Sequence, residues 1–302
     1  MLYHAYTLWL FTYSSHKDTV YPSVAFALST ALSPSIFPFT FTPPRLPLSI
    51  LWTWLALLFF SLHNQHAPAS VLEDAINKPW RPLPSKRITT RQTHAVLAAV
   101  YPVWLGFSLH LGAIKQCLGL TVLTWYYCEF GGGEQGGFAR NALNALGYSC
   151  FFAGALQVLV GPADDVYTGK ALGWLVVVSL IVFSMIHAQD FRDEEGDGLR
   201  GRTSVATAVG DRAARWMIVA AAGFWSVVVP AVLGLGVVVT VLLGGVAAVL
   251  SGYILRHLGS RTLERDVVLY KLFLLWFIFV IFSPLIQTSL TVGGPWWFGG
   301  YY

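Results

Sequence analysis

Residues 51–82 read LWTWLALLFFSLHNQHAPASVLEDAINKPWRP, and this stretch changes from apolar to polar with no linker between its two parts. The apolar part belongs to a run over 44–63, and about 20 apolar residues suffice to cross a bilayer as a helix. The polar part holds Glu73 and Asp74, followed by Lys78 and Arg81. Because carboxylates bind Mg²⁺ and cations bind phosphate, the stretch predicts a membrane span that ends in a metal–diphosphate site.

The composition of the whole chain indicates an all-α, multi-pass membrane protein. Of its 302 residues, 55% are hydrophobic and 11% are charged, whereas a soluble domain carries about 25% charged residues. We expect one domain over 1–302, because no long Ser, Gly or Pro linker divides the chain. The nine expected spans are 18–35, 44–63, 92–113, 115–130, 139–160, 169–189, 213–233, 236–256 and 270–290.

The distribution of basic residues supports nine spans and orients them. With nine spans, all 19 Lys and Arg residues except Arg45, Lys115 and Lys170 fall on the side that also carries the polar cluster. The positive-inside rule then places this side in the cytosol. The net charge of +4 is therefore a consequence of membrane topology, and it gives no indication of a nucleic-acid partner.

A second acidic cluster follows the sixth expected span. Residues 189–197 read QDFRDEEGD, and on a helix with about 100° per residue Asp190, Asp193, Glu194 and Asp197 share one face. Carboxylates on one face repel each other and need a cation, which Mg²⁺ bound to a phosphate supplies. The alternative is a solvated helix end that leads into a charged loop.

The first cluster cannot lie on one helix. Asn64 and Asp74 are ten residues apart with Pro68 between them, so the span must break and the chain must fold back.

A turn then follows over 77–84, where three prolines fix the backbone and hold Lys78 and Arg81 near the site. Arg can bind diphosphate oxygens with two parallel hydrogen bonds, although positive-inside charge is the alternative explanation for these cations. The further candidates for diphosphate binding are Asn77, Arg140, Asn141 and Arg202.

His63 and His66 flank Asn64, and a zinc site at this pair is a disfavoured alternative. No further His or Cys lies at ligand spacing from them in the sequence.

Aromatic residues make up 15% of the chain, and some of them must face the interior of the bundle. An aromatic cavity stabilises a carbocation by about 0.5–2 kcal/mol per ring. The candidates for such a cavity are Trp125, Tyr126, Tyr127, Tyr148, Phe151, Phe183 and Trp276.

The two clusters resemble known signatures. Residues 74–84, DAINKPWRPLP, with Asn64 and Gln65 upstream, resemble the first motif of the UbiA superfamily, and residues 190–197 resemble the second. The resemblance covers essentially the whole chain. It implies a helical bundle around a central cavity, in which Mg²⁺ lies between the motifs and holds an isoprenyl diphosphate. Most members are aromatic prenyltransferases, and a smaller branch in fungi and bacteria are membrane-bound terpene cyclases.

The first motif departs from the usual prenyltransferase form, which has an Asn followed by Asp four and eight residues later. Aligned on Asp74, those positions hold His66 and Ser70, and Asn64 lies two residues too far upstream. An adjacent pair, Glu73 and Asp74, replaces the spaced acids. This form resembles the fungal cyclase branch.

The residues and the resemblance together assign roles in the site. The expected catalytic residues are Asp74, Asp190 and Asp193. The expected Mg²⁺ ligands are Asn64, Glu73, Asp74, Asp190, Asp193, Glu194 and Asp197. The expected diphosphate ligands are Asn77, Lys78, Arg81, Arg140, Asn141 and Arg202.

Our first hypothesis is a Mg²⁺-dependent terpene cyclase that ionises farnesyl or geranylgeranyl diphosphate and cyclises the cation. A prenyltransferase, which would pass the same cation to an aromatic acceptor, is the alternative, and a non-catalytic membrane carrier is a third possibility. Besides the substrate and the bilayer, the sequence gives no evidence of an obligate protein partner. The fungal resemblance implies the endoplasmic-reticulum membrane.

Overall fold

The computed structural model describes residues 2–192, 203–260 and 262–291, and within these ranges every regular element is a helix or a helical turn. The elements are α1 (Leu2–Thr12), η1 (Tyr13–Ser15), η2 (His16–Val20), α2 (Tyr21–Ala31), η3 (Pro43–Arg45), α3 (Leu46–Gln65), α4 (Pro68–Asn77), α5 (Thr90–Leu111), α6 (Ile114–Cys128), η4 (Gly132–Glu134), α7 (Gly137–Val160), α8 (Gly169–Met185), η5 (Ile186–Gln189), α10 (Val205–Val209), α11 (Asp211–Leu233), α12 (Val237–Arg256) and α13 (Leu263–Thr291). The all-α prediction is confirmed.

Seven of the described helices are long and apolar enough to cross a membrane, and they are α3, α5, α7, α8, α11, α12 and α13. The expected spans 18–35 and 115–130 are also helical, but α2 has only 11 residues and α6 only 15. Pro34 follows shortly after α2, and Gly131 with a φ of 71° follows α6. Pro34 keeps α2 from reaching the expected end at residue 35, whereas α6 matches the expected 115–130 within two residues and is simply too short for a full span. The count of nine is therefore approximate.

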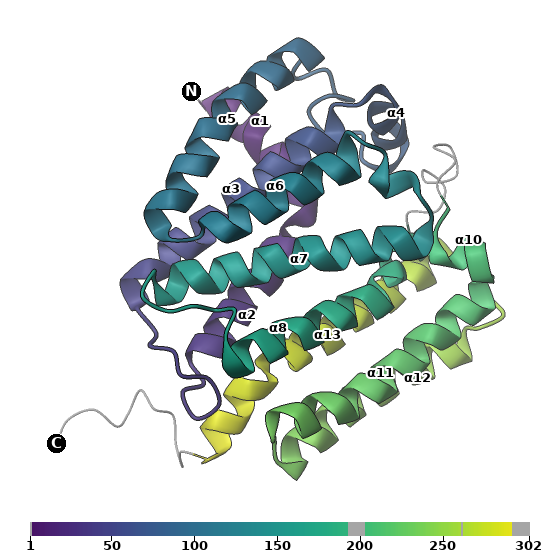
Figure 1. The fold of residues 1–302 in the computed structure, drawn as a ribbon. Coiled ribbons are helices and arrows are strands. Elements are labelled where there is room, and N and C mark those ends of the chain that lie inside the picture. Colours follow the sequence, from purple (N-terminus) through teal and green to yellow (C-terminus); the bar gives the residue numbers. More distant parts are fainter. Residues whose placement is uncertain (1, 193–202, 261, 292–302) are drawn as a thin grey trace.

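The long helices lie side by side, with α7 in the middle of the array (Figure 1). Two hydrophobic clusters of buried residues meet at α7, where Phe151 belongs to the cluster of α3, α5 and α6. Its neighbour Phe152 belongs to the cluster of α2, α8, α11, α12 and α13. Helix α7 therefore joins the two parts of the bundle.

A close contact fixes α7 against α3. A Cβ atom added at Gly154 would lie 1.9 Å from Cη2 of Trp52, so only glycine allows this approach. The Trp52 indole N–H donates a 3.0 Å hydrogen bond to Ser108 Oγ on α5, which satisfies the one polar atom of this buried ring. The contact joins α3, α5 and α7.

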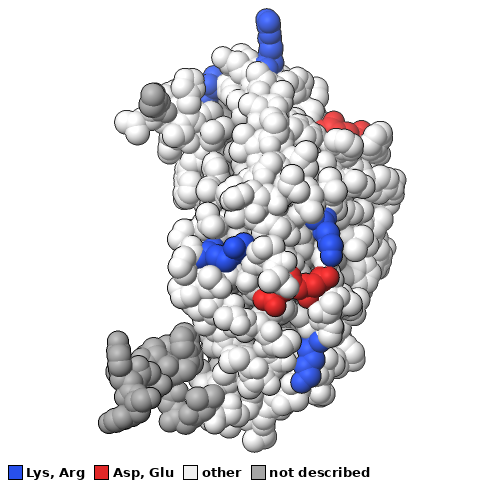
Figure 2. Space-filling model, turned by 60° about the vertical axis from the view of Figure 1, so that its left-hand side comes forward, with Lys and Arg blue, Asp and Glu red and all other residues white. Residues whose placement is uncertain are grey.

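The face of the bundle drawn in Figure 2 is mostly uncharged, and its acidic side chains gather mainly in one group near the centre, with basic side chains close by. Arg45 is partly buried and donates hydrogen bonds to Val158 O at 2.6 Å and to Leu111 O at 3.3 Å. It thereby satisfies carbonyl groups at the carboxyl ends of α7 and α5.

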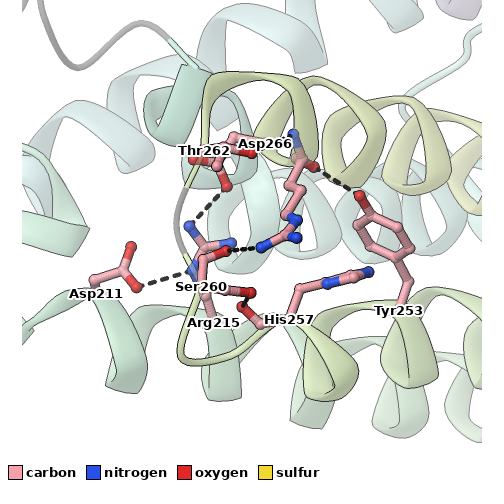
Figure 3. Close-up of polar contacts among 8 residues, drawn as sticks. Asp211, Arg215, Tyr253, His257, Ser260, Thr262 and Asp266 are labelled. Atoms are coloured by element: carbon pink, nitrogen blue, oxygen red, sulfur yellow. Dashed lines mark hydrogen bonds and ion pairs between the residues drawn. The ribbon is translucent and has the colours of Figure 1, made fainter.

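An ion-pair network joins α11 to α13 (Figure 3). Arg215 donates to Asp211 at 2.9 Å and to Asp266 at 2.7 Å, and the Arg215 side chain is only 5% exposed. The positive-inside rule predicts Arg215 as a cytosolic-side topology charge, whereas its side chain is buried in the bundle. The sequence could not show this, because the partner Asp266 is 51 residues away.

Candidate active site

An inner cavity of about 190 Å³ lies where the first acidic cluster meets α6 and α7. Its polar lining comes from several elements and consists of Ser15, Asp18, Thr19, Asn64, Ser70, Glu73, Asp74, Lys78, Arg81, Thr124, Arg140, Asn144 and Gln189. Its remaining lining consists of Leu57, Phe60, Leu120, Leu123, Tyr127, Leu143, Gly147 and Tyr148. The cavity thus places charged groups of both signs next to an apolar and aromatic wall.

The predicted break in the first cluster is present. Helix α3 ends at Gln65 and α4 begins at Pro68, so Asn64 and Asp74 lie on different helices. The chain folds back between them, and both residues line the inner cavity together with Glu73. The side chains of Asn64, Glu73 and Asp74, which all carry oxygen ligands, therefore come together at this cavity from two helices.

The turn after α4 brings Arg81 back onto Asp74. Backbone hydrogen bonds from Lys78 N to Asp74 O at 2.8 Å and from Arg81 N to Lys78 O at 3.0 Å close the turn. Arg81 Nη1 then donates to both Asp74 carboxylate oxygens, at 2.7 and 2.8 Å, and both side chains are less than a tenth exposed. Lys78 and Arg81 both line the inner cavity.

Two buried N–H donors near this turn have no acceptor within the described part of the chain. They are Arg81 Nε and Asn77 Nδ2. A buried donor without an acceptor costs free energy, and an anion such as diphosphate can supply the acceptor.

Asp190, the first residue of the second acidic cluster, is connected to the same cavity through α7. Asp190 follows η5 directly and is buried, and it forms an ion pair with Arg140, which lines the inner cavity beside Gln189. Asp74 therefore lines the inner cavity, whereas Asp190 is connected to it through Arg140, and each carboxylate is paired with an arginine. Asp193, Glu194, Asp197 and Arg202 lie outside the described residues.

Aromatic contacts anchor the residues that follow Asp190. The Arg215 guanidinium lies 4.3 Å from the centre of the Phe191 ring, and the Arg192 guanidinium lies 4.6 Å from the centre of the Tyr270 ring. Such cation–π contacts stabilise by about 0.5–2 kcal/mol each, more when desolvated. The network of Figure 3 thus continues from Arg215 to the segment that carries Asp190.

Asn141 is placed away from the inner cavity. Its amide donates a 3.0 Å hydrogen bond to Phe183 O on α8 and is absent from the cavity lining, which contains Asn144 one helical turn further along α7. The sequence could not choose between the two, because the rotation of α7 is set by its packing.

Sequence reasoning missed Asp18, which lines the inner cavity from the π-helical turn η2. Asp18 is the only acidic residue before Glu73, and an acid at the edge of an apolar segment is a functional candidate. This sequence signal could have found it, and in the structure the π-helical turn is a second indication, since such turns tend to occur at functional sites.

Two of the seven aromatic candidates, Tyr127 and Tyr148, line the inner cavity, and Phe60 also lines it although it was not predicted. Trp125, Tyr126 and Phe183 are exposed, whereas Phe151 and Trp276 are packed in the hydrophobic clusters.

A second cavity of about 820 Å³, here called the lateral cavity, adjoins the first. Lys78 lines both cavities, and Asn77 lines the lateral one. Aromatic residues form much of its wall. They include Trp9 from α1, Tyr21 from α2 and Trp80 from the turn that follows α4.

The sequence of the chain is similar to a family model and to several characterised proteins. The model of the UbiA prenyltransferase family matches residues 64–278. The chain is 30% identical over 221 residues to the fumagillin beta-trans-bergamotene synthase of Aspergillus fumigatus, covering 73% of this chain and 72% of that protein. It is 27% identical to the somaliensene A/B synthase of Streptomyces somaliensis, covering 92% and 91% of the two chains. It is 26% identical to a polyprenyl transferase of Hericium erinaceus, covering 86% and 88%.

Among solved structures, a UbiA homologue from Archaeoglobus fulgidus bound to GPP and Mg²⁺ has the same fold. The TM-score is 0.66 at 14% identity, and the match covers 91% of this chain and 99% of that one.

Proposed function

The chain belongs to the UbiA prenyltransferase family of integral membrane enzymes, and on that premise we propose that it is a Mg²⁺-dependent class I terpene cyclase. Its proposed substrate is a linear isoprenyl diphosphate, either farnesyl or geranylgeranyl diphosphate. The proposed products are a sesqui- or diterpene hydrocarbon and diphosphate. Two relatives that match most of the chain are named as synthases of terpenes, which supports this choice.

The observation that carries the proposal is the composition of the inner cavity. One small space is lined by acidic residues, by three cations and by aromatic rings. Lys78 and Arg81 come from the turn after α4, and Arg140 comes from α7. A substrate with an anionic head and an apolar tail matches both parts of this lining.

The donor set fits Mg²⁺, which takes oxygen ligands from one or two carboxylates and from phosphate. Asn64, Glu73 and Asp74 line the cavity, and Asp190 joins it through Arg140, so these residues would hold the ion. The residues Asp193, Glu194 and Asp197 belong to the same proposal, although they lie outside the described residues. Bound Mg²⁺ supplies Lewis-acid polarisation of the diphosphate oxygens.

The cations of the site would stabilise the negative charge that develops on the leaving diphosphate. Arg81 has a buried Nε–H with no acceptor in the described structure, and Lys78 and Arg140 face the same space. Preorganised charges of this kind typically contribute about 2.7–4 kcal/mol each to transition-state stabilisation.

The apolar wall would protect and shape the carbocation. The rings of Phe60, Tyr127 and Tyr148 line the cavity and present faces that attract a cation, by about 0.5–2 kcal/mol each. Four leucines beside them keep water away from the cation before it cyclises and loses a proton.

A prenyltransferase is the second candidate. The lateral cavity adjoins the inner one at Lys78 and has an aromatic wall, so it offers space for an aromatic acceptor. One relative of similar coverage is named as a polyprenyl transferase.

We also propose that residues 1–302 act as one domain in the endoplasmic-reticulum membrane with the site facing the cytosol. The excess of Lys and Arg on the side of both acidic clusters supports this orientation.

An acceptor-free assay tests the proposed function. Purified protein in lipid nanodiscs is incubated with Mg²⁺ and farnesyl or geranylgeranyl diphosphate, and the hydrocarbons are extracted and identified. We expect a cyclic hydrocarbon, and chelation of the metal should abolish its formation. Consumption of the diphosphate only after addition of a phenol or aromatic acid would show the transferase, and no turnover under either condition would contradict both.

A further inference from the structure

A second cluster of metal-binding side chains lies beside the inner cavity and contributes nothing to its lining. His63 Nδ1 lies 2.6 Å from Glu129 Oε1, and His66 Nε2 lies 3.0 Å from the same oxygen. One ligand atom from each of the three residues lies within 4.8 Å of those of the other two. Two imidazoles and one carboxylate form a ligand set that zinc uses with water in the fourth position.

The backbone brings the three residues together at two helix ends. His63 is in the last turn of α3 and His66 follows its end, while Glu129 follows the end of α6. The carboxyl end of a helix carries partial negative charge, which favours a cation. Glu129 is 63 residues from His66, so spacing along the sequence could not indicate the third ligand.

Outer contacts orient both imidazole rings. His63 Nε2 lies 2.8 Å from the Tyr101 hydroxyl, which also accepts a 2.6 Å hydrogen bond from Trp125 Nε1. His66 Nδ1 lies 3.3 Å from His94 Nε2. Partners of this kind on the far ring nitrogen are typical of histidines that bind metals, because they fix the ring and its tautomer.

This cluster is distinct from the diphosphate site. Asn64 lies between His63 and His66 in the sequence and lines the inner cavity, whereas neither histidine does. Nitrogen ligands favour zinc and similar transition metals, while the oxygen donors of the inner cavity favour Mg²⁺.

We propose that His63, His66 and Glu129 bind a zinc ion that ties the end of α3 to the end of α6. The ion would thereby hold the break between α3 and α4, where Asn64 enters the wall of the inner cavity. It acts as a positioning element, and the ion itself does not touch the diphosphate.

The number of zinc ions bound per chain tests this proposal independently of enzyme activity. The full chain, purified in detergent with excess Mg²⁺, is equilibrated with limiting Zn²⁺ at a series of concentrations, desalted and analysed for zinc per chain. We expect about one zinc per wild-type chain. Replacement of an outer partner typically weakens a metal site 10–100-fold, so loss of a direct ligand in Glu129→Gln or His66→Ala should raise the Kd about 100-fold or more.

Two control variants separate this site from other zinc-binding groups. His110→Ala removes an exposed histidine from α5, the helix that carries His94, and should bind zinc as the wild type does. Asp190→Asn alters the diphosphate site and should also keep the zinc. Cobalt in place of zinc gives visible absorption bands of a low-coordinate site, which should disappear in Glu129→Gln.

Three outcomes would overturn the proposal. The first is a wild-type chain without stoichiometric zinc, in which case the cluster is a hydrogen-bond network only. The second is wild-type zinc affinity in Glu129→Gln, a variant that keeps the shape of the side chain. The third is loss of zinc in Asp190→Asn, which would assign the ion to the diphosphate site. Elution of each variant as the wild-type species in size-exclusion chromatography shows that the variant is folded.

Discussion

Replacing Arg81 by methionine tests whether its buried pair with Asp74 supports both stability and function. Arg81 Nη1 lies 2.7 and 2.8 Å from the two Asp74 oxygens, and the side chains are 7% and 3% exposed. Arg81→Met leaves the carboxylate inside the bundle without this countercharge, and breaking a buried pair costs about 3–5 kcal/mol. We expect the free energy of unfolding, measured by SDS titration in mixed micelles, to fall by about that amount.

The double variant Asp74→Asn/Arg81→Met separates stability from catalysis. It removes the stranded charge as well, so it should be more stable than Arg81→Met alone. Acceptor-free turnover should nevertheless fall by about 10²–10³-fold or more in both variants, because each loses groups that act on the diphosphate. If the double variant were destabilised by the sum of the two single changes, the two side chains would not be coupled and the reasoning would be refuted.

Three further substitutions give separate tests. Asp190→Asn should abolish turnover while the protein still inserts in membranes, and wild-type product formation in this variant would remove Asp190 from the site. Arg215→Met removes the countercharge of the buried Asp266 and should lower the free energy of unfolding by about 3–5 kcal/mol. An unchanged SDS midpoint would show that the network of Figure 3 is not stabilising. Gly154→Ala places a methyl group 1.9 Å from the Trp52 ring and should destabilise by about 1–3 kcal/mol, while Gly147→Ala, which meets no atom within 4 Å, is its matched control.

Local features of the sequence predicted much of the first acidic cluster. Pro68 starts a new helix after the break, and the prolines after Asn77 close a turn that returns Arg81 to Asp74. Proline fixes its own backbone and restricts the residue before it, so these features are encoded over a few residues. The all-α class followed equally directly from composition.

Features that depend on helix rotation or on long-range contacts were not accessible to the same reasoning. Asn141 points to α8, and of the seven aromatic candidates only Tyr127 and Tyr148 line the cavity, because packing against neighbouring helices selects the inward face. Glu129 meets His63 across 66 residues of chain, and no local pattern signals such a pairing.

Helix length is a third feature that the sequence predicted only in part. A helix lies in each of the nine expected segments, but only seven of the described helices are long and apolar enough to cross a membrane, and α2 and α6 have just 11 and 15 residues. Apolar residues continue past Pro34, beyond the end of α2, whereas α6 ends close to the expected boundary because a glycine-rich stretch follows it.

The most direct test of the central claim is a cryo-EM structure of the full chain with Mg²⁺ and an unreactive thiolo analogue of farnesyl diphosphate. Our account predicts the diphosphate in the inner cavity, with metal density between Asp74 and Asp190 and with Arg81 and Arg140 on the phosphate oxygens. Diphosphate density in the lateral cavity, or metal bound by only one of the two acidic clusters, would contradict it.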